Sequence, residues 1–347
     1  MGQVEALSYR TMPWLAAACL ALAAAPAIGA AAPTPRVALA GVNLAGAEFN
    51  GGRLPGRPSF DYVYPSGSEI AYFAGKGASV IRLPVLWERL QPDLNGPLDR
   101  GELDRLRATL GLAKRSDLSV VIDIHDYGGY RGQAVGSAAV PVEAFVDLWS
   151  RLAAEFPSDD RIIFGLMNEP IAMDGPTLRT AANRAIAAIR ATGARNLILV
   201  PGVGWSGAHD FVGRSGPFLL DITDPGHNFA YEAHQYLDAD HSGTHWTCVD
   251  PKAARERLAA MTAWLRAHRR QGFLGEFGAA SNPACLASLD ALLGYLGDNA
   301  DVWRGWTYWA AGAWWGDYPM SVEPKGGADR PQMDVLVRYF PRAHSER

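Results

Sequence analysis

Short runs of nearly continuous apolar residues alternate along the chain with longer segments whose apolar residues recur at helical spacing. Runs that are apolar on both faces are typical of strands in a parallel sheet, where helices cover each face. The runs predicted to be strands are Val37–Leu44, Ser79–Val85, Ser119–His125, Arg161–Met167, Asn196–Pro201, Asn228–His234, Gly272–Phe277 and Trp303–Trp309.

The segment Pro141–Phe156 shows the helical pattern most clearly, because Val142, Phe145, Trp149 and Leu152 fall on one face. Two more helices are predicted where a capping residue precedes a proline. These starts are Asp250-Pro251 and Asn282-Pro283. Residues 205–223 carry little helical pattern, although they separate two predicted strands.

Eight strands with intervening helices predict one (β/α)8 barrel, a TIM barrel, as a single domain. A doubly wound open sheet is the alternative, and it would require a phosphate-binding glycine loop after its first strand. The segment after Leu44 is rich in glycine, but no helix start of the G-x-G-x-x-G kind follows it. The pattern therefore favours the barrel.

The N-terminal region differs in composition from the rest of the chain. Trp14–Ala32 is apolar and rich in alanine and ends in small residues, as a secretory signal peptide does. Pro26 and Gly29 interrupt this run, which makes a membrane anchor the weaker interpretation. We expect residues 1–31 to be a signal peptide, and residues 32–347 to form a secreted or periplasmic domain that is not attached to a membrane.

Charge and cysteine content narrow the function classes. The 32 Lys and Arg against 36 Asp and Glu give a net charge of -4, which argues against a nucleic-acid-binding protein. Of the 3 cysteines, Cys19 lies in the predicted signal peptide. Cys248 and Cys285 would remain in the mature chain, where an oxidising compartment would allow them to form a disulfide. We expect a monomer.

Polar residues follow or end most of the predicted strands. In a (β/α)8 barrel the C-terminal strand ends face the active site, so these side chains are expected to meet at one mouth. They are Arg82, His125, Asn168, Glu169, His234, Tyr236, Glu276 and Trp309. Glu169 and Glu276 supply two carboxyl groups, the minimum machinery for cleaving a glycosidic bond, and the aromatic residues suit the apolar faces of sugar rings.

The ordered motifs IRLPV, DIHDY, LMNEP, EAHQYLD, LGEFG and WTYWAAGAWWGDY make the prediction more specific. In this order and spacing, from Gly41 to about Pro324, the chain resembles the endoglucanases of glycoside hydrolase family 5. The resemblance implies a (β/α)8 barrel and a secreted, retaining endo-β-1,4-glucanase that acts on β-1,4-glucan chains or cello-oligosaccharides. One departure is Asp126, because the family often has H-N-Y where this chain has His-Asp-Tyr.

Matching the motifs position by position implies the roles of the site residues. Glu169 corresponds to the acid/base and Glu276 to the nucleophile, and we expect their carboxyl groups to lie about 5–5.5 Å apart, as in retaining enzymes. Arg82 and Tyr236 are expected to lower the pKa of Glu276. The implied substrate-binding residues are Arg82, His125, Asn168, His234, Tyr236 and Trp309.

Alternative functions differ from this one in the substrate or in the absence of catalysis. The same machinery could act on mannan, xyloglucan or xylan, and a non-catalytic carbohydrate-binding barrel is a further alternative. The segment HQYLDADHSGTH contains histidines and aspartates, but the chain has no H-E-x-x-H motif, so we expect neither a metal nor another cofactor. The segment GWSGAH lacks the closing glycine of a nucleophile elbow, which argues against a serine hydrolase.

Overall fold

The computed structural model describes residues 1–2, 36–157 and 159–341. Eight parallel strands close into a barrel in the order β1-β10-β9-β8-β7-β6-β3-β2. The barrel strands are β1 (Leu39–Leu44), β2 (Val80–Val85), β3 (Ser119–Ile124), β6 (Ile162–Gly165), β7 (Ile198–Pro201), β8 (Phe229–His234), β9 (Gly272–Glu276) and β10 (Trp303–Ala311). Each predicted strand run therefore matches one barrel strand, although β10 extends two residues beyond its predicted run, and the predicted (β/α)8 fold is confirmed.

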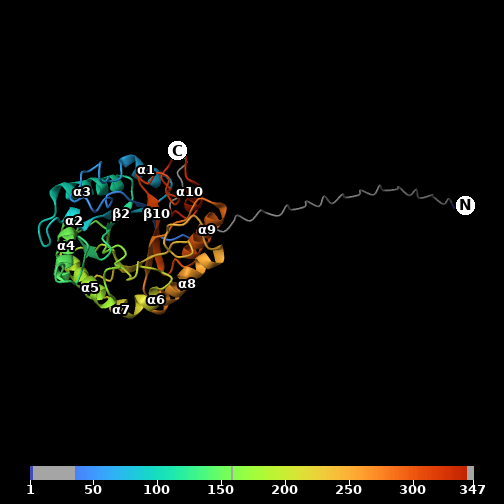
Figure 1. Ribbon diagram of the computed structural model, residues 1–347. Helices are drawn as coiled ribbons and strands as arrows, with labels where there is room; N and C mark the ends of the chain where they lie inside the picture. Colours follow the sequence, from blue (N-terminus) through green and yellow to red (C-terminus); the bar gives the residue numbers. More distant parts are fainter. Residues whose placement is uncertain (3–35, 158, 342–347) are drawn as a thin grey trace. The chain divides into compact units, whose positions relative to one another are not determined.

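Helices surround the strands on the outside of the barrel (Figure 1). They are α1 (Gly67–Gly75), α2 (Trp87–Leu90), α3 (Arg100–Arg115), α4 (Val142–Glu155), α5 (Gly175–Ala191), α6 (Phe211–Arg214), α7 (Gly216–Leu219), α8 (Pro251–Ala267), α9 (Pro283–Asp298) and α10 (Pro331–Leu336). The predicted helix starts are confirmed, because the side chains of Asp250 and Asn282 accept hydrogen bonds from first-turn amides of α8 and α9.

Two segments differ from the regular pattern. The weakly patterned residues 205–223 contain only the four-residue helices α6 and α7 between strands β7 and β8. After β3 the chain forms a small antiparallel hairpin, β4 (Gly129–Tyr130) and β5 (Gln133–Ala134), which the sequence pattern did not reveal. The hairpin belongs to the segment between β3 and α4.

Side chains along each strand point alternately to the outside and to the inside of the barrel. In β8, Tyr231 and Ala233 pack in the large core between strands and helices, whereas Ala230 belongs to a separate cluster of strand residues inside the barrel. Because side chains alternate along a strand, Glu232 and His234 also point inward, above Ala230. The barrel interior therefore changes from apolar to charged towards the C-terminal strand ends.

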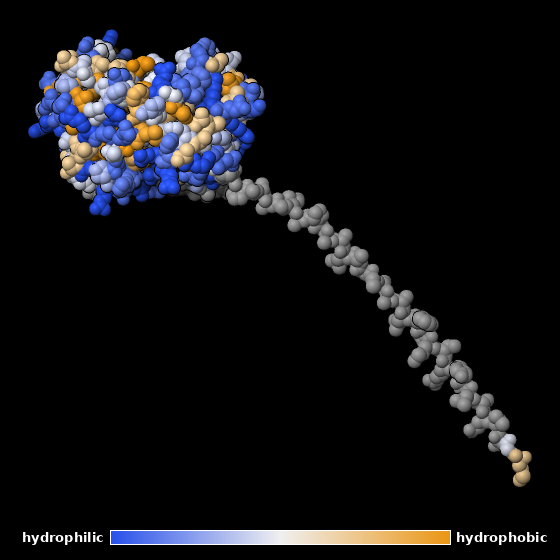
Figure 2. Space-filling model, turned by 90° about the horizontal axis from the view of Figure 1, so that it is seen from below, coloured by the Kyte–Doolittle hydropathy of each residue, from blue (hydrophilic) through white to orange (hydrophobic). Residues whose placement is uncertain are grey.

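The predicted signal peptide, residues 1–31, lies outside the described residues except for its first two. Among the residues that the structure describes, no helix has the length and apolar character needed to cross a membrane. Figure 2 shows apolar side chains interspersed with hydrophilic ones on one face of the barrel.

Candidate active site

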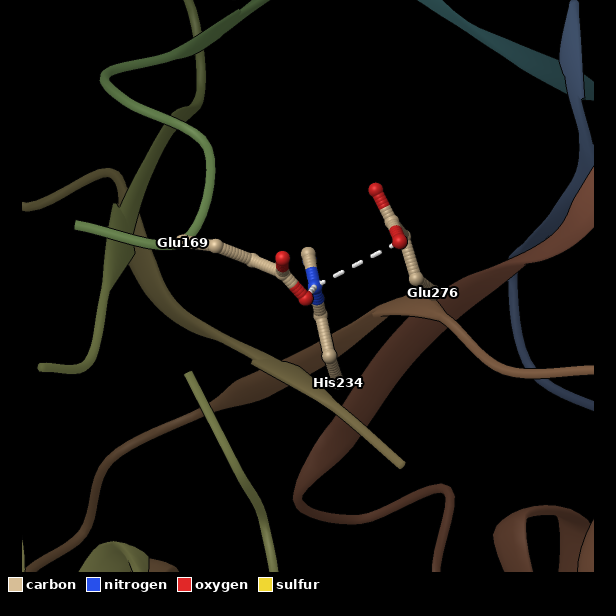
Figure 3. A group of neighbouring side chains, drawn as sticks. All are labelled: Glu169, His234 and Glu276. Atoms are coloured by element: carbon tan, nitrogen blue, oxygen red, sulfur yellow. Dashed lines mark hydrogen bonds and ion pairs between the residues drawn. The ribbon is translucent and has the colours of Figure 1, made fainter. Parts of the chain in front are cut away.

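Two carboxyl groups face each other at the C-terminal mouth of the barrel (Figure 3). Glu276 is the last residue of β9, and Glu169 follows β6 in a backbone conformation with a positive φ of 39°. His234, the last residue of β8, lies between them. One oxygen of each carboxyl group and one nitrogen of His234 all lie within 4.8 Å of one another.

Glu276 is buried and held by two donors. Arg82 donates from Nη1 to Oε1 at 2.8 Å, and the Tyr236 hydroxyl donates to Oε2 at 2.7 Å. Burial alone would raise the pKa of Glu276, but the positive charges of His234 and Arg82 outweigh it and hold this pKa below its usual value. These charges favour the ionised form of Glu276.

Glu169 has the opposite electrostatic environment. Burial raises its pKa, and the negative charge of Glu276 raises it further, against the hydrogen bond from His234. His234 Nδ1 lies 2.8 Å from Glu169 Oε1, and the Glu169 side chain is 13% exposed. Burial disfavours the charged form of His234, yet the carboxylates of Glu276, Glu169 and Glu232 raise the pKa of His234 to about 10. The site thus holds one carboxyl group that stays ionised and one that retains a proton more readily.

Arg82 connects most of the charged groups inside the barrel. Besides Glu276, its guanidinium contacts Glu232 at 2.9 Å and Asp123 at 3.0 Å. It also donates to the side-chain oxygen of Asn168 at 2.8 Å. Because Arg82 is fully buried, these carboxylates balance a charge that would otherwise be costly to bury.

Asp123 and Glu232 were missed by the sequence analysis. Both lie within runs predicted as buried strands, two residues before the strand-end histidines. Asp123 Oδ2 lies 2.7 Å from His125 Nδ1, and Glu232 Oε1 lies 3.6 Å from His234 Nε2. The alternation of strand side chains was the signal that could have found them, because it places each on the same side as its histidine.

The other predicted binding residues lie around the same mouth. His125 Nε2 is 3.3 Å from the Asn168 amide nitrogen and 3.3 Å from the Tyr127 hydroxyl. The indole of Trp309 stacks on the His125 ring, with centroids 5.6 Å apart and an interplanar angle of 13°. The structure therefore brings together all eight predicted site residues.

A cleft of about 750 Å³ opens over the carboxyl groups. Its walls include Tyr127, which is 42% exposed, and two strongly exposed indoles, Trp205 at 52% and Trp246 at 60%. Trp315 packs edge-on against Trp309, with ring centroids 5.6 Å apart. Exposed aromatic faces of this kind are suited to stacking against sugar rings.

The predicted disulfide between Cys248 and Cys285 is present, with Cα atoms 5.1 Å apart. It joins the loop after β8 to the first turn of α9. Next to it, the Asn282 side chain donates to the carbonyl of Trp246 at 2.7 Å. The disulfide therefore supports the loop that carries one of the cleft tryptophans.

The loop after β8 also holds the acidic residues considered as metal ligands. Oxygens of Asp238 and Asp240 and a nitrogen of His245 lie within 4.8 Å of one another. The buried Asp238 carboxylate accepts hydrogen bonds from the backbone amides of Gly243 at 3.1 Å and Thr244 at 3.0 Å. These contacts fold the loop around Asp238, which gives the cluster a structural role.

Two closely spaced carboxyl groups, one with a lowered pKa and one with a raised pKa, lie at the C-terminal mouth of a (β/α)8 barrel. This arrangement is that of a glycoside hydrolase. The family model of Cellulase (glycosyl hydrolase family 5) matches residues 41–312. The chain belongs to this family, and the predicted resemblance is confirmed.

Relatives of known name span nearly the whole domain. Endo-beta-1,4-glucanase B of Aspergillus niger is 37% identical over 302 residues, which cover 86% of this chain and 89% of the relative. The structure of XacCel5A in complex with cellopentaose is 49% identical, has a TM-score of 0.86, and covers 87% of this chain and 99% of the other. Pseudomonas stutzeri endoglucanase Cel5A, in complex with cellobiose, is 35% identical with a TM-score of 0.82, covering 90% and 96%.

Proposed function

We propose that the protein is a secreted, retaining endo-β-1,4-glucanase that hydrolyses internal bonds of cellulose and related β-glucans. The observation that carries the proposal is the pair of carboxyl groups with oxygens within 4.8 Å, one with a lowered pKa and one with a raised pKa. Retaining glycosidases have carboxyl groups about 5–5.5 Å apart, whereas inverting enzymes leave about 6.5–9.5 Å for a water molecule.

In the first step of the proposed reaction, Glu276 attacks the anomeric carbon while Glu169 protonates the leaving oxygen. A glycosyl-enzyme ester forms on Glu276, and the leaving chain departs as an alcohol. Formation of the ester removes the negative charge of Glu276, so the pKa of Glu169 falls. Glu169 then accepts a proton from water, which attacks the ester and releases the sugar with its original anomeric configuration.

The surrounding residues would position the substrate and the carboxylates. Arg82 and Tyr236 fix the two oxygens of Glu276, and His234 fixes Glu169. The Asn168 amide nitrogen, which lies 3.3 Å from His125 Nε2, would donate to the sugar 2-hydroxyl, a contact that strengthens in the transition state. Trp309 would stack on the reacting sugar.

The proposed substrate is a β-1,4-glucan chain. Relatives covering most of this chain are named endo-β-1,4-glucanases, and one solved relative is a complex with cellopentaose. Equatorial hydroxyls leave both faces of each glucose ring apolar, which suits the exposed indoles of Trp205 and Trp246 along the cleft wall. An open cleft with aromatic walls favours internal cleavage.

Secretion and a monomeric state are part of the proposal. The signal-like composition of residues 1–31 supports export, and a disulfide is typical of proteins in oxidising compartments. Terminal sequencing of protein recovered from the medium or periplasm would test this directly. A start close to residue 32 is expected, and an intact residue 1 would contradict the cleavage.

A reducing-sugar assay on carboxymethylcellulose beside mannan, xyloglucan and xylan tests the activity. We expect carboxymethylcellulose to be cleaved faster than mannan, with a rapid fall in viscosity and no activity in Glu276→Ala. If mannan were cleaved faster, the substrate would be assigned as mannan. If no polymer were cleaved, a carbohydrate-binding barrel would be favoured. Proton NMR of the first product should show the β-anomer, since the α-anomer would indicate inversion.

A further inference from the structure

Two histidines outside the catalytic pair stack on each other in the wall of the cleft. His209 lies between β7 and α6, and His241 lies in the loop after β8. Their ring centroids are 3.7 Å apart, and the ring planes differ by only 5°. The stack therefore joins two segments of the cleft wall, one carrying Trp205 and the other carrying Trp246.

Gln235 contacts both rings, and the backbone fixes the orientation of its side-chain amide. Gln235 Oε1 accepts from the His209 backbone amide at 3.0 Å, and Nε2 donates to the Tyr236 carbonyl at 3.0 Å. The opposite orientation would place N–H against N–H and carbonyl against carbonyl. Gln235 is 1% exposed, and its backbone amide donates to the Glu276 carbonyl at 2.9 Å. The amide is therefore a fixed reference for the two rings.

This orientation determines which ring nitrogens carry protons. Gln235 Nε2 lies 2.8 Å from His241 Nδ1, and an amide nitrogen can only donate. His241 Nδ1 must therefore be the acceptor, so the ring is neutral and carries its proton on Nε2. Gln235 Oε1 lies 3.2 Å from His209 Nδ1, and this oxygen can only accept. The same amide thus requires a proton on Nδ1 of His209 and none on Nδ1 of His241.

The charged surroundings also favour a neutral His241. Burial lowers the pKa of His241, and the positive charges of Arg257 and of a protonated His209 lower it further, against the carboxylates of Asp238 and Asp210. Arg257 of α8 donates to the Tyr236 carbonyl at 2.5 Å, and Asp210 is paired with Arg214 at 2.7 Å. The other titratable groups around the pair belong to the same loop and to the cleft, namely Asp240, His245, Tyr236, Tyr318, Glu169, His234 and Glu276.

We propose that Gln235 is a positioning residue that holds His241 on His209, and that it fixes this part of the cleft wall only while His241 is neutral. A proton taken from solvent by His241 Nδ1 would face the Gln235 N–H, so the hydrogen bond would be lost. The charged ring would then separate from His209, which weakens binding of the glucan chain in acid. The inference rests on the proposed function only for its kinetic test, because the protonation of His241 can be observed without substrate.

The first experiment follows the imidazole nitrogens by NMR of protein labelled with nitrogen-15 histidine. Above neutral pH, His241 should carry its proton on Nε2 and His209 on Nδ1, and His241 should titrate below the usual histidine pKa of about 6.5. H209N and H241N assign the two sets of signals. In Q235M the donor to His241 is removed at similar side-chain length, so the proton affinity of His241 should rise severalfold. The control is H227N, which changes an exposed histidine before β8 and should leave both rings as they are.

The second experiment measures steady-state kinetics on carboxymethylcellulose as a function of pH. In the natural protein and in H227N, KM should rise severalfold as pH falls through the pKa of His241. In H241N, KM should stay flat, because asparagine can accept the Gln235 hydrogen bond but cannot be protonated. The acid fall of kcat, which reports the protonation of Glu276, should keep the same midpoint in all three proteins. This difference between KM and kcat separates the cleft wall from the catalytic pair.

A proton on Nδ1 of neutral His241 in the natural protein would overturn the proposal, and so would an unchanged His241 titration in Q235M. If Q235M does not fold, the ring nitrogens of the natural protein still decide whether Gln235 donates to His241. A KM that changes in parallel in the natural protein and H241N would overturn the link to substrate binding. Absence of cleavage of every polymer by the natural protein would defeat the proposed function instead, and the NMR result would still decide the histidine pair.

Discussion

Replacement of Cys248 and Cys285 by alanine tests how far the disulfide stabilises the barrel. The bridge closes a segment with a sequence separation of 37 residues. In the chain-entropy description, a closed loop of this length stabilises the folded state by about 4 kcal/mol. A change of 1 kcal/mol moves the melting temperature of a domain of 150–250 residues by about 2–4 °C. The barrel is larger, so we expect a fall of about 8 °C or somewhat less.

The measurement is thermal unfolding by calorimetry of both proteins in the mature form that begins near residue 32, which does not contain Cys19. Because the disulfide lies next to the loop that carries Trp246, the alanine variant should also show a higher KM for long substrates, measured well below its melting temperature. Cleavage of a short activated substrate should be less affected. An unchanged melting temperature, or two free thiols in the unreduced and denatured parent protein, would refute this reasoning.

Four further predictions concern the catalytic site. The pH profile of kcat/KM should be bell-shaped: activity falls at low pH as Glu276, whose pKa is lowered, becomes protonated, and at high pH as Glu169, whose pKa is raised, loses its proton. With a dinitrophenyl cellobioside, azide should convert Glu169→Ala to a β-glycosyl azide and Glu276→Ala to an α-glycosyl azide; exchanged anomers in NMR would reverse the assigned roles. Arg82→Gln should destabilise the fold by about 3–5 kcal/mol in denaturant unfolding, because it leaves buried carboxylates without their cation; a loss below about 1 kcal/mol would contradict this. Mannose should be disfavoured against glucose, because its axial 2-hydroxyl meets the Asn168 donor at a changed angle, by several kcal/mol at most in competitive kcat/KM; equal values would contradict it.

The barrel could be predicted from the sequence because its strands are covered on both faces. Such strands appear as short apolar runs, and each of the predicted runs coincides with most or all of one strand of the barrel. The β4–β5 hairpin could not be predicted in this way, because strands of two residues show no periodicity. Its place is set by tertiary contacts instead, including the hydrogen bond from the Arg131 amide to Glu88.

The site was predictable to the extent that its residues end strands. Glu169, Glu276 and the strand-end histidines follow apolar runs, where barrel chemistry is expected. Asp123 and Glu232 lie inside the runs, where a charged residue is unexpected in a buried strand. Their place is understood only once it is known which side chains of each strand face the inside of the barrel. Register then explains them: Arg82 pairs with Val121 of β3, two residues before Asp123, so that the next inward position carries the carboxylate.

The charge balance inside the barrel contributes to the difference in pKa between Glu169 and Glu276. The cations Arg82 and His234 face more carboxylates than they can neutralise, namely Asp123, Glu232, Glu276 and Glu169. Arg82 donates directly to Glu276, whereas Glu169 is held by His234, so burial and, after it, the negative charge of Glu276 raise the pKa of Glu169. In the proposed mechanism, ester formation on Glu276 removes one of these charges. The same imbalance that keeps a proton on Glu169 for the first step is then relieved, and Glu169 becomes available as the base for the second.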